Sequence, residues 1–287
     1  MEEFDAAVYK AETRRVWDAT CPGWEASLEY FERGAAAVTA RLLELADLRP
    51  GQSVLDVATG HGEPALSAAR VVGPAGRVVG VDLSPRMVEA AMARAEGMDN
   101  VTFAVADLED LDGAGIGGGF DAVLSRFGLM FAVDRVAALR TLFGRLRPAG
   151  VLAAAVWGPP DRHLMSVGPV ALAERIGLPA PAVGAPGPFG MADPGRLRAD
   201  LVAAGFGGVE VGELVAPFWF SSVAEYVRFN RTALPPPLLA RVAERFGSAD
   251  DPDTWAAVGR AAERYVGGDG VLRLPSVALC LRAVRPG

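Results

Sequence analysis

Short apolar runs alternate with stretches of helical periodicity through the middle of this chain. Each run ends at polar or small residues and is too short for a helix, which is typical of strands buried on both faces. We expect strands at 53–57, 77–81, 101–105, 120–125 and 150–157. We expect helices at 63–72, 85–95 and 134–146. Strands that alternate with helices predict an α/β fold with a largely parallel sheet.

Helical spacing also dominates the two ends of the chain. Residues 1–48 are predicted to be helical and to form a lid, or alternatively to dock on the sheet as an amphipathic segment. After the strand ending at Trp157, the pattern predicts helices at 163–176 and 192–205 and a strand at 208–219. Helices are expected at 222–231, 236–246 and 252–266, before a last strand at 271–284 with a bulge at Pro275. We therefore divide the chain into a lid, 1–48, and a main domain, 49–287, with cap segments at about 159–190 and 221–268.

A tight glycine turn follows the first of these strands. Gly60 and Gly62 open the next helix, and Asp82 ends the following strand twenty residues after Gly62. A strand, a glycine turn, a helix and a second strand ending in a carboxylate are typical of sites for adenosine-containing cofactors. The turn also fits the pattern G-x-G-x-x-G/A, so a nicotinamide- or flavin-dependent oxidoreductase is one alternative.

Three other features favour a different cofactor. Asp56 lies within the first strand, where a carboxylate suits a ligand with an ammonium group better than a pyrophosphate. Asp107 and Leu108 follow the third strand and are suited to accept from an adenine amino group and cover the ring. Ser125 ends the fourth strand, so all these groups come at carboxyl ends of strands, where open α/β sheets bind ligands.

At these residues, from about Gly51 to Trp157, the chain resembles the class I S-adenosylmethionine (SAM) methyltransferases. The runs SRFGLMF at 125–131 and LRPAG at 146–150 resemble the branch with quinone-ring and bacterial natural-product methyltransferases. The resemblance implies a Rossmann-like, doubly wound, seven-stranded, mostly parallel sheet with order 3-2-1-4-5-7-6, an N-terminal helical lid and inserted cap helices. It implies SAM as cofactor and S-adenosylhomocysteine as product.

The resemblance also implies cofactor-binding residues. The methionine end of SAM is assigned to Asp56, Ala58, Gly60, Gly62 and Ser125, and the adenosine end to Asp82, Leu83, Asp107 and Leu108. Two positions depart from the family pattern: Ala58 stands where many members have glycine, and His61 where threonine or serine is common. His61 is either a solvated loop residue or a contact for the SAM carboxylate.

Residues for the methyl acceptor are harder to assign, because methyl transfer from a sulfonium needs alignment more than a fixed catalytic motif. His163 is the candidate general base, since it follows the fifth strand and histidine titrates near neutral pH. The other candidates for the substrate pocket are Tyr9, Trp17, Trp24, Arg126, Phe127, Met130, Trp157, Tyr226 and Asn230. Each of these has an alternative structural role, in core packing or in a surface ion pair.

Composition narrows the range of partners. The 287 residues carry a net charge of −7, which disfavours nonspecific binding to nucleic acid or to an anionic membrane. Two distant cysteines predict neither a disulfide framework nor a metal site. No signal-peptide pattern or membrane-spanning run is seen, so we expect a cytoplasmic monomer or homodimer.

We therefore predict a SAM-dependent methyltransferase that acts on a small, largely apolar or aromatic metabolite, most plausibly in natural-product biosynthesis. A quinone-precursor ring C-methyltransferase is the alternative within the class. From other classes, the alternatives are a SAM-binding protein that does not methylate, such as a cyclase or a regulatory binder, and an NAD-dependent oxidoreductase.

Overall fold

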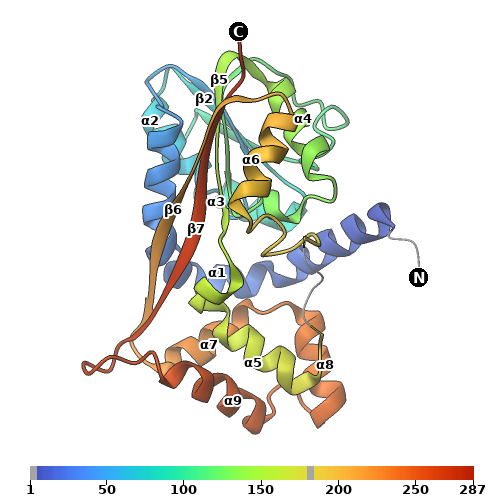
Figure 1. Cartoon of the computed structure of the whole chain (residues 1–287), viewed down its shortest axis with the longest axis vertical. Coiled ribbons are helices and arrows are strands. Elements are labelled where there is room, and N and C mark those ends of the chain that lie inside the picture. Colours follow the sequence, from blue (N-terminus) through green and yellow to red (C-terminus); the bar gives the residue numbers. More distant parts are fainter. Residues whose placement is uncertain (1–4, 180–183) are drawn as a thin grey trace. The chain divides into compact units, whose positions relative to one another are not determined.

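The computed structural model describes residues 5–179 and 184–287, which form two compact units (Figure 1). Unit 1 comprises Met1–Ala36, Pro160–Ala182 and Val215–Ser276. Unit 2 comprises Ala37–Pro159, Val183–Leu214 and Val277–Gly287. Each unit is described by itself below.

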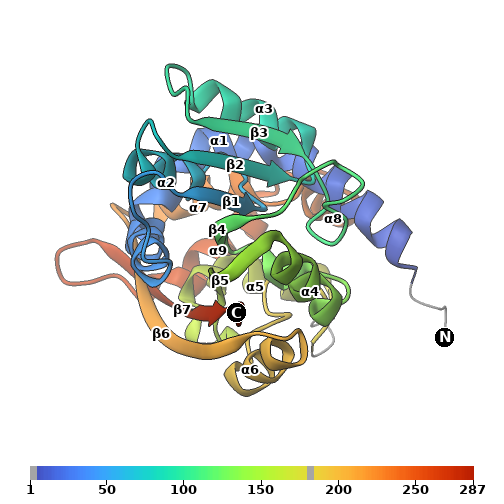
Figure 2. The same cartoon turned by 90° about the horizontal axis from the view of Figure 1, so that it is seen from above.

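Unit 2 is built on a seven-stranded sheet, whose last two strands extend into unit 1. The strands are β1 (Ser53–Val57), β2 (Arg77–Asp82), β3 (Val101–Val105), β4 (Phe120–Arg126), β5 (Leu146–Trp157), β6 (Gly207–Phe220) and β7 (Leu272–Val284). Their order is β3-β2-β1-β4-β5-β7-β6, which confirms the predicted topology (Figure 2). Strands β1 to β5 pair in parallel, and β7 runs antiparallel to β5. The carboxyl ends of five strands therefore meet at one edge of the sheet.

Helices cover the sheet of unit 2 on both sides. They are α2 (Ala65–Val72), α3 (Pro85–Arg94), α4 (Arg135–Arg145), α6 (Pro194–Ala203) and the last part of α1 (Ala6–Leu45), with a short 3-10 turn, η1, at Leu129–Phe131. Helix α2 lies on the opposite side of the sheet from α4 and α6 (Figure 2). Asn100 closes the end of α2, because its side-chain amide donates to the carbonyls of Ala69 and Gly73 at 2.7 and 2.9 Å.

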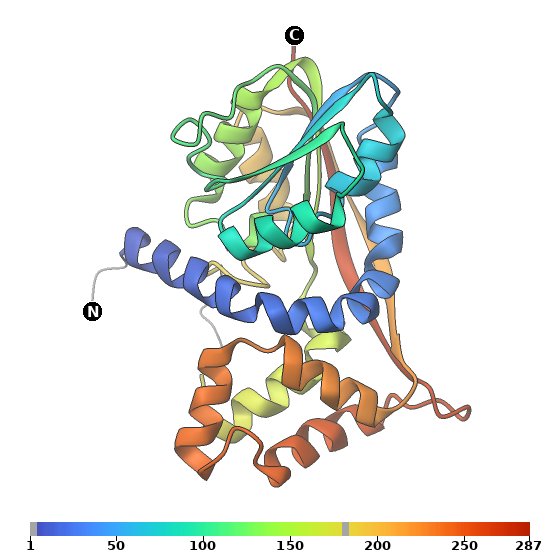
Figure 3. The same ribbon diagram turned by 180° about the vertical axis from the view of Figure 1, so that it is seen from behind.

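Unit 1 is a helical cluster. Its helices are the first part of α1, α5 (Val167–Ile176), α7 (Val223–Ala233), α8 (Pro236–Phe246) and α9 (Pro252–Glu263), with 3-10 turns η2 (Pro160–Arg162) and η3 (Leu164–Ser166). Helices α5, α7, α8 and α9 pack together (Figure 3). The end of β6 adds Phe218 and Phe220, which are fully buried against aromatic side chains of α1 and α7.

The structure differs from the sequence-based expectations at three places. The helix expected over 163–176 begins only at Val167, because two 3-10 turns precede it. The N-terminal segment is one continuous helix that includes Pro22. An unexpected register shift lies between β4 and β5, at Phe120/Ala122, and the bulge expected at Pro275 stays a prediction, because the pairing of β7 with β5 covers only Ala278–Val284. Among residues 5–179 and 184–287, no helix is both long and apolar enough to cross a bilayer.

Candidate cofactor site

The parallel pairing of β1 to β4 brings the predicted cofactor residues to one edge of the unit 2 sheet. Asp56 is the fourth residue of β1, Asp82 is the last residue of β2, and Ser125 is the next-to-last residue of β4. Asp107 follows β3 by two residues. Because the strands are in register, these side chains share the carboxyl edge of the sheet, as expected from sequence.

The glycine turn after β1 is shaped by left-handed backbone conformations. Gly60 and Gly62 have φ values of 54° and 98°. Ala58 also has a positive φ, 55°, which costs a non-glycine residue about 1–2 kcal/mol. A Cβ atom added at Gly60 would have no neighbour within 4 Å, so the turn presents bare backbone to open space. Such a surface lets a ligand approach the main chain closely.

Asp56 is the buried acid of this edge. Its side chain is 0% exposed, and Oδ2 accepts from the Thr59 hydroxyl at 2.5 Å and from the Ala65 N–H at 3.1 Å. Its other oxygen, Oδ1, has no hydrogen-bond partner among the described residues. Burial raises the pKa of Asp56 to about 7, against the opposing effect of these donors and of the Arg126 charge. A buried polar atom without a partner costs about 1–3 kcal/mol, which a ligand donor would relieve.

Asp82 ties the glycine turn to the end of β2. Its Oδ2 accepts from the Gly60 N–H at 2.8 Å and its Oδ1 from the Ser84 N–H at 2.9 Å. Ser84 in turn caps α3 by accepting from the Met87 N–H. Asp82 therefore fixes the position of the glycine turn relative to the start of α3.

The third strand end carries Asp107 and Leu108, both half-buried. Oδ1 of Asp107 accepts from the Glu109 N–H at 2.9 Å, and the backbone forms a bridge between Asp107 and Asp110. This tight reversal fixes the acid and the leucine side by side at the sheet edge.

Ser125 and Arg126 lie at the end of β4, and both side chains form hydrogen bonds within the protein. Ser125 is fully buried and its hydroxyl donates to the Val57 carbonyl at 2.9 Å, which joins the ends of β4 and β1. Arg126 donates to the Thr39 hydroxyl of α1 at 2.8 Å. Gly128 follows, and a Cβ atom there would lie 2.3 Å from the Cβ of Ala58. The turns after β1 and β4 are therefore in direct contact.

Aromatic side chains follow at the same edge. Phe127 and Trp157, at the ends of β4 and β5, stack with ring centroids 3.7 Å apart and planes at 16°. Phe127 has a φ of 62°, held by a 2.7 Å hydrogen bond from its N–H to the Ala155 carbonyl. Met130 is buried, and its carbonyl accepts from the Gly187 N–H at 3.0 Å. With Arg126, four of the predicted substrate-pocket residues are thus brought to the carboxyl edge of unit 2.

The remaining pocket candidates lie in unit 1. The ring centroids of Trp17 and Trp24, both on α1, are 6.4 Å apart. The ring of Trp24 also packs edge-on against Phe229, with 6.2 Å between the ring centroids. Tyr9 is half-buried near the start of the same helix. Aromatic contacts within unit 1 therefore account for much of the surface of Trp24.

Tyr226 and Asn230 are buried on α7. The Tyr226 hydroxyl donates to the Met165 carbonyl and accepts from the Gly168 N–H, both at 2.8 Å. Burial raises the pKa of Tyr226 well above its usual range. The Asn230 amide donates to the Tyr226 carbonyl at 2.9 Å. These bonds organise the start of α5, and a contact with substrate stays a prediction.

His163 is 8% exposed and lies between the two 3-10 turns. It forms a backbone bridge with Ser276, whose hydroxyl accepts from the Met165 N–H at 3.0 Å. Burial lowers the pKa of His163 to about 4, so the ring is neutral at physiological pH.

His61 corrects one sequence-based alternative. It is 7% exposed, so the idea of a solvated loop residue is wrong. The Arg94 guanidinium of α3 donates to the His61 carbonyl and holds the turn from outside. Sequence reasoning also missed Thr59, the hydroxyl partner of Asp56, and Thr39, the partner of Arg126. A hydroxyl residue three positions after a buried acid is the one signal that pointed to the first of these.

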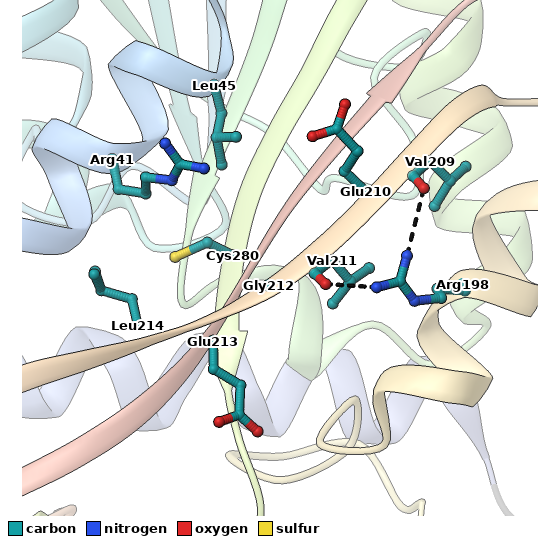
Figure 4. A pocket seen from close by; sticks show the side chains of 10 residues that line it. All are labelled: Arg41, Leu45, Arg198, Val209, Glu210, Val211, Gly212, Glu213, Leu214 and Cys280. Atoms are coloured by element: carbon teal, nitrogen blue, oxygen red, sulfur yellow. Dashed lines mark hydrogen bonds between the residues drawn. The ribbon is translucent and has the colours of Figure 1, made fainter.

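A separate pocket of about 320 Å³ lies at the β6 edge of unit 2 (Figure 4). Its lining is Arg41, Leu45, Arg198, Val209, Glu210, Val211, Gly212, Glu213, Leu214 and Cys280. Arg198 donates to the carbonyls of Val209 and Val211, so these edge-strand acceptors are covered. Burial raises the pKa of the Cys280 thiol to about 11, which keeps it unreactive. None of the strand-end carboxylates lines this pocket.

Comparison with known proteins decides the family. Residues 54–150 match the family described as a methyltransferase domain. The chain is 34% identical over 213 residues to nocamycin O-methyltransferase of Saccharothrix syringae, covering 69% of this chain and 70% of that protein. The chain belongs to the SAM-dependent methyltransferases. It is a class I member of the small-molecule branch, and the oxidoreductase alternative is set aside.

Other relatives of this methyltransferase fit the same assignment. It is 35% identical over 127 residues to the ubiquinone/menaquinone biosynthesis C-methyltransferase UbiE of Pseudomonas putida strain F1, covering 43% of this chain and 49% of that protein. Its fold is similar to that of the YcgJ protein of Bacillus subtilis, with a TM-score of 0.56, 18% identity, and coverage of 87% and 98% of the two chains. It is also similar to the [4+2]-cyclase SpnF, with a TM-score of 0.51, 22% identity, and coverage of 88% and 82%.

The residues of the methyltransferase fit SAM as the cofactor. SAM carries an ammonium group, a ribose diol and an adenine ring. The edge offers a buried carboxylate with a bare oxygen at Asp56, a second carboxylate at Asp82 and open space above Gly60. The donor and acceptor chemistry of the site therefore agrees with the family.

Proposed function

We propose that this methyltransferase transfers a methyl group to a small, largely apolar or aromatic metabolite, as a tailoring step in natural-product biosynthesis. The observation that carries the substrate class is the stacked pair Phe127 and Trp157, which lies at the edge that also carries the carboxylates and is followed along the chain by buried Met130. An apolar, aromatic wall suits an apolar or planar acceptor. The similarity to nocamycin O-methyltransferase supports the natural-product context and an oxygen acceptor.

Within this proposal, each part of SAM is assigned to particular residues of the chain. Oδ1 of Asp56 accepts from the ammonium group, and Ala58, Gly60, Gly62 and Ser125 surround the methionine portion. Asp82 accepts from the ribose hydroxyls, Leu83 covers the adenine, and Asp107 with Leu108 takes the adenine edge. The bare oxygen of Asp56 and the position of the Asp82 carboxylate beside the Gly60 turn support these assignments.

The chemistry needs little from the protein beyond alignment. SAM, when bound, would supply a methyl group made electrophilic by the sulfonium, with the thioether S-adenosylhomocysteine as the leaving group. The chain's contribution is to hold the acceptor and exclude water, for which Phe127, Met130 and Trp157 are proposed. Tyr9, Trp17, Trp24, Tyr226, Asn230 and Arg126 are proposed as further acceptor contacts.

His163 is proposed as the base that takes the proton of the acceptor. A pKa of about 4 leaves its ring nitrogen available at neutral pH but makes it a weak base. This assignment therefore suits an acceptor whose own hydroxyl is acidic, such as a phenol or an enol.

Two alternative functions each have one comparison that speaks for them. Similarity to UbiE favours methylation of a ring carbon on a quinone precursor. Similarity of fold to a [4+2]-cyclase favours a protein that binds SAM without transferring its methyl group.

Mass spectrometry with trideuteromethyl SAM tests the proposal. The protein is incubated with phenolic, enolic and quinol acceptors, and products are examined for the labelled methyl group and for its attachment to oxygen or carbon. Asp82→Ala should lower labelling at limiting cofactor by about 10–100-fold, whereas Asp112→Ala, at an exposed loop acid, is the matched control. Labelling on carbon would favour the quinone alternative, and SAM binding with diene cyclisation but no labelling would favour the cyclase.

A further inference from the structure

The carboxyl group of Asp56 is enclosed without a compensating cation. Its side chain is fully buried, its Oδ2 accepts two hydrogen bonds, and Oδ1 has no partner among the described residues. An ionised carboxylate in such a place leaves its charge on an oxygen that nothing solvates, whereas the neutral acid avoids that cost. The geometry therefore favours a protonated Asp56 when no ligand is bound.

Charged and titratable groups around Asp56 come from each neighbouring element. Arg126 on β4 contributes a favourable charge, yet its guanidinium is bonded to Thr39 and forms no ion pair with Asp56. Glu63 in the turn contributes an unfavourable charge. Asp82 on β2 is a second carboxylate near the turn and accepts from the Gly60 N–H. His61 is a titratable side chain of the same turn. On balance, these neighbours leave Asp56 without a contacting positive charge.

We propose that Asp56 holds a proton in the free methyltransferase and releases it to solvent when the ammonium group of SAM binds. The proposal rests on the assignment of Asp56 to the ammonium group made above. The ammonium ion then supplies both the hydrogen bond that Oδ1 lacks and the charge that stabilises the carboxylate. Only the Asp56 O–H bond breaks, and its proton passes to the buffer.

The coupling has a defined pH range. With a pKa of about 7 in the free protein, binding releases about 0.9 proton at pH 6 and about 0.5 at pH 7. Affinity should therefore be about fivefold weaker at pH 6 than at pH 7, because the proton competes with the ammonium group. Above about pH 8 the amine of the free ligand begins to lose its own proton, so the experiment belongs at or below pH 7.

Isothermal titration calorimetry with S-adenosylhomocysteine measures the release directly. The titration is run at pH 6 in phosphate and in imidazole, whose ionisation enthalpies differ, and the difference in heat gives the number of protons released. The expected result is about 0.9 proton for the wild-type protein. 5′-Methylthioadenosine, which lacks the amino-acid group, should bind with no release.

Variants identify the group that titrates. Asp56→Asn should abolish the proton release. His61→Gln is the control, because histidine is the residue type that ordinarily titrates near pH 6.5, and this variant should retain the release. If Asp56→Asn does not fold, Thr59→Val replaces it. Loss of the Thr59 hydroxyl raises the pKa of Asp56, so that release at pH 7 should rise above the wild-type value.

The outcomes separate this inference from the proposed function. Tight binding of S-adenosylhomocysteine with no proton release at pH 6 would overturn the coupling and leave the methyltransferase assignment intact. Proton release that is lost in His61→Gln but retained when Asp56 is altered would also overturn the coupling. Failure of S-adenosylhomocysteine to bind at all would contradict the site itself.

Discussion

Gly128→Ala probes the contact between the two turns that carry the cofactor residues. An alanine Cβ at this position would lie 2.3 Å from the Cβ of Ala58 and 2.9 Å from the Ser125 hydroxyl. Carbon atoms pack at about 3.5–4.0 Å, so the two turns must separate by more than 1 Å or the chain must distort. Overpacking of this kind costs about 1–3 kcal/mol. The turn that bears Gly60 should move with it, so affinity for S-adenosylhomocysteine should fall by about tenfold or more.

Thermal unfolding and calorimetric titration measure the two effects. For a chain of this size, the loss of stability corresponds to a melting temperature lowered by about 2–5 °C. Gly144→Ala is the matched control, because a Cβ atom at that position in α4 would have no neighbour within 4 Å. It should leave binding unchanged and stabilise the helix by about 0.5–1 kcal/mol.

A double-mutant cycle tests whether the contact between positions 128 and 58 causes both effects. Ala58→Gly removes the atom that Gly128→Ala would strike, and it suits the φ of 55° at that position. The double variant should therefore recover a large part of both stability and affinity. Normal binding by Gly128→Ala, or no recovery in the double variant, would show that the two turns do not position the cofactor together.

Three further changes test separate groups. Asp82→Ala removes a charge-assisted acceptor and should weaken SAM binding by about 10–100-fold, or about 1.5–3 kcal/mol, in calorimetric titration; unchanged affinity would refute the ribose assignment. His163→Gln should lower kcat with little change in SAM affinity, and equal turnover on the true substrate would make His163 structural only. Tyr226→Phe leaves the buried Gly168 N–H without its 2.8 Å acceptor and should cost about 1–3 kcal/mol of stability in chemical denaturation, with SAM affinity unchanged.

The convergence of the strand-end acids could be predicted from sequence because it depends on local patterns. Asp56 lies within a short apolar run, and Asp82 and Asp107 end or follow one. Parallel pairing of these strands then places the three acids at one edge of the sheet. The bond from Thr59 to Asp56 was not foreseen, because the spacing of the two residues allows it but the backbone path of the turn decides whether it forms. The same holds for the contact between Gly128 and Ala58.

The segments proposed for the acceptor were less predictable for a physical reason. A buried aromatic residue gives the same pattern whether it contacts substrate or fills a core. Trp24 and Tyr226 were proposed as pocket residues on that pattern, and the structure places both in aromatic or hydrogen-bonded packing of unit 1. The start of α5 was misplaced because Leu164 and Met165 continue the helical apolar pattern, although the chain there forms a 3-10 turn.

Unfavourable local conformations gather where β1 and β4 end. Ala58 and Phe127 directly follow the adjacent strands β1 and β4, and both have left-handed backbone conformations that cost a residue with a side chain about 1–2 kcal/mol. Asp56, in the same strand end, leaves a buried oxygen without a partner in the described structure. Such features persist when the surrounding structure holds them in place, and they concentrate at functional sites. Here the hydrogen bonds from Phe127 to the Ala155 carbonyl and from Gly60 to Asp82 do so, which keeps the cofactor edge shaped before a ligand arrives.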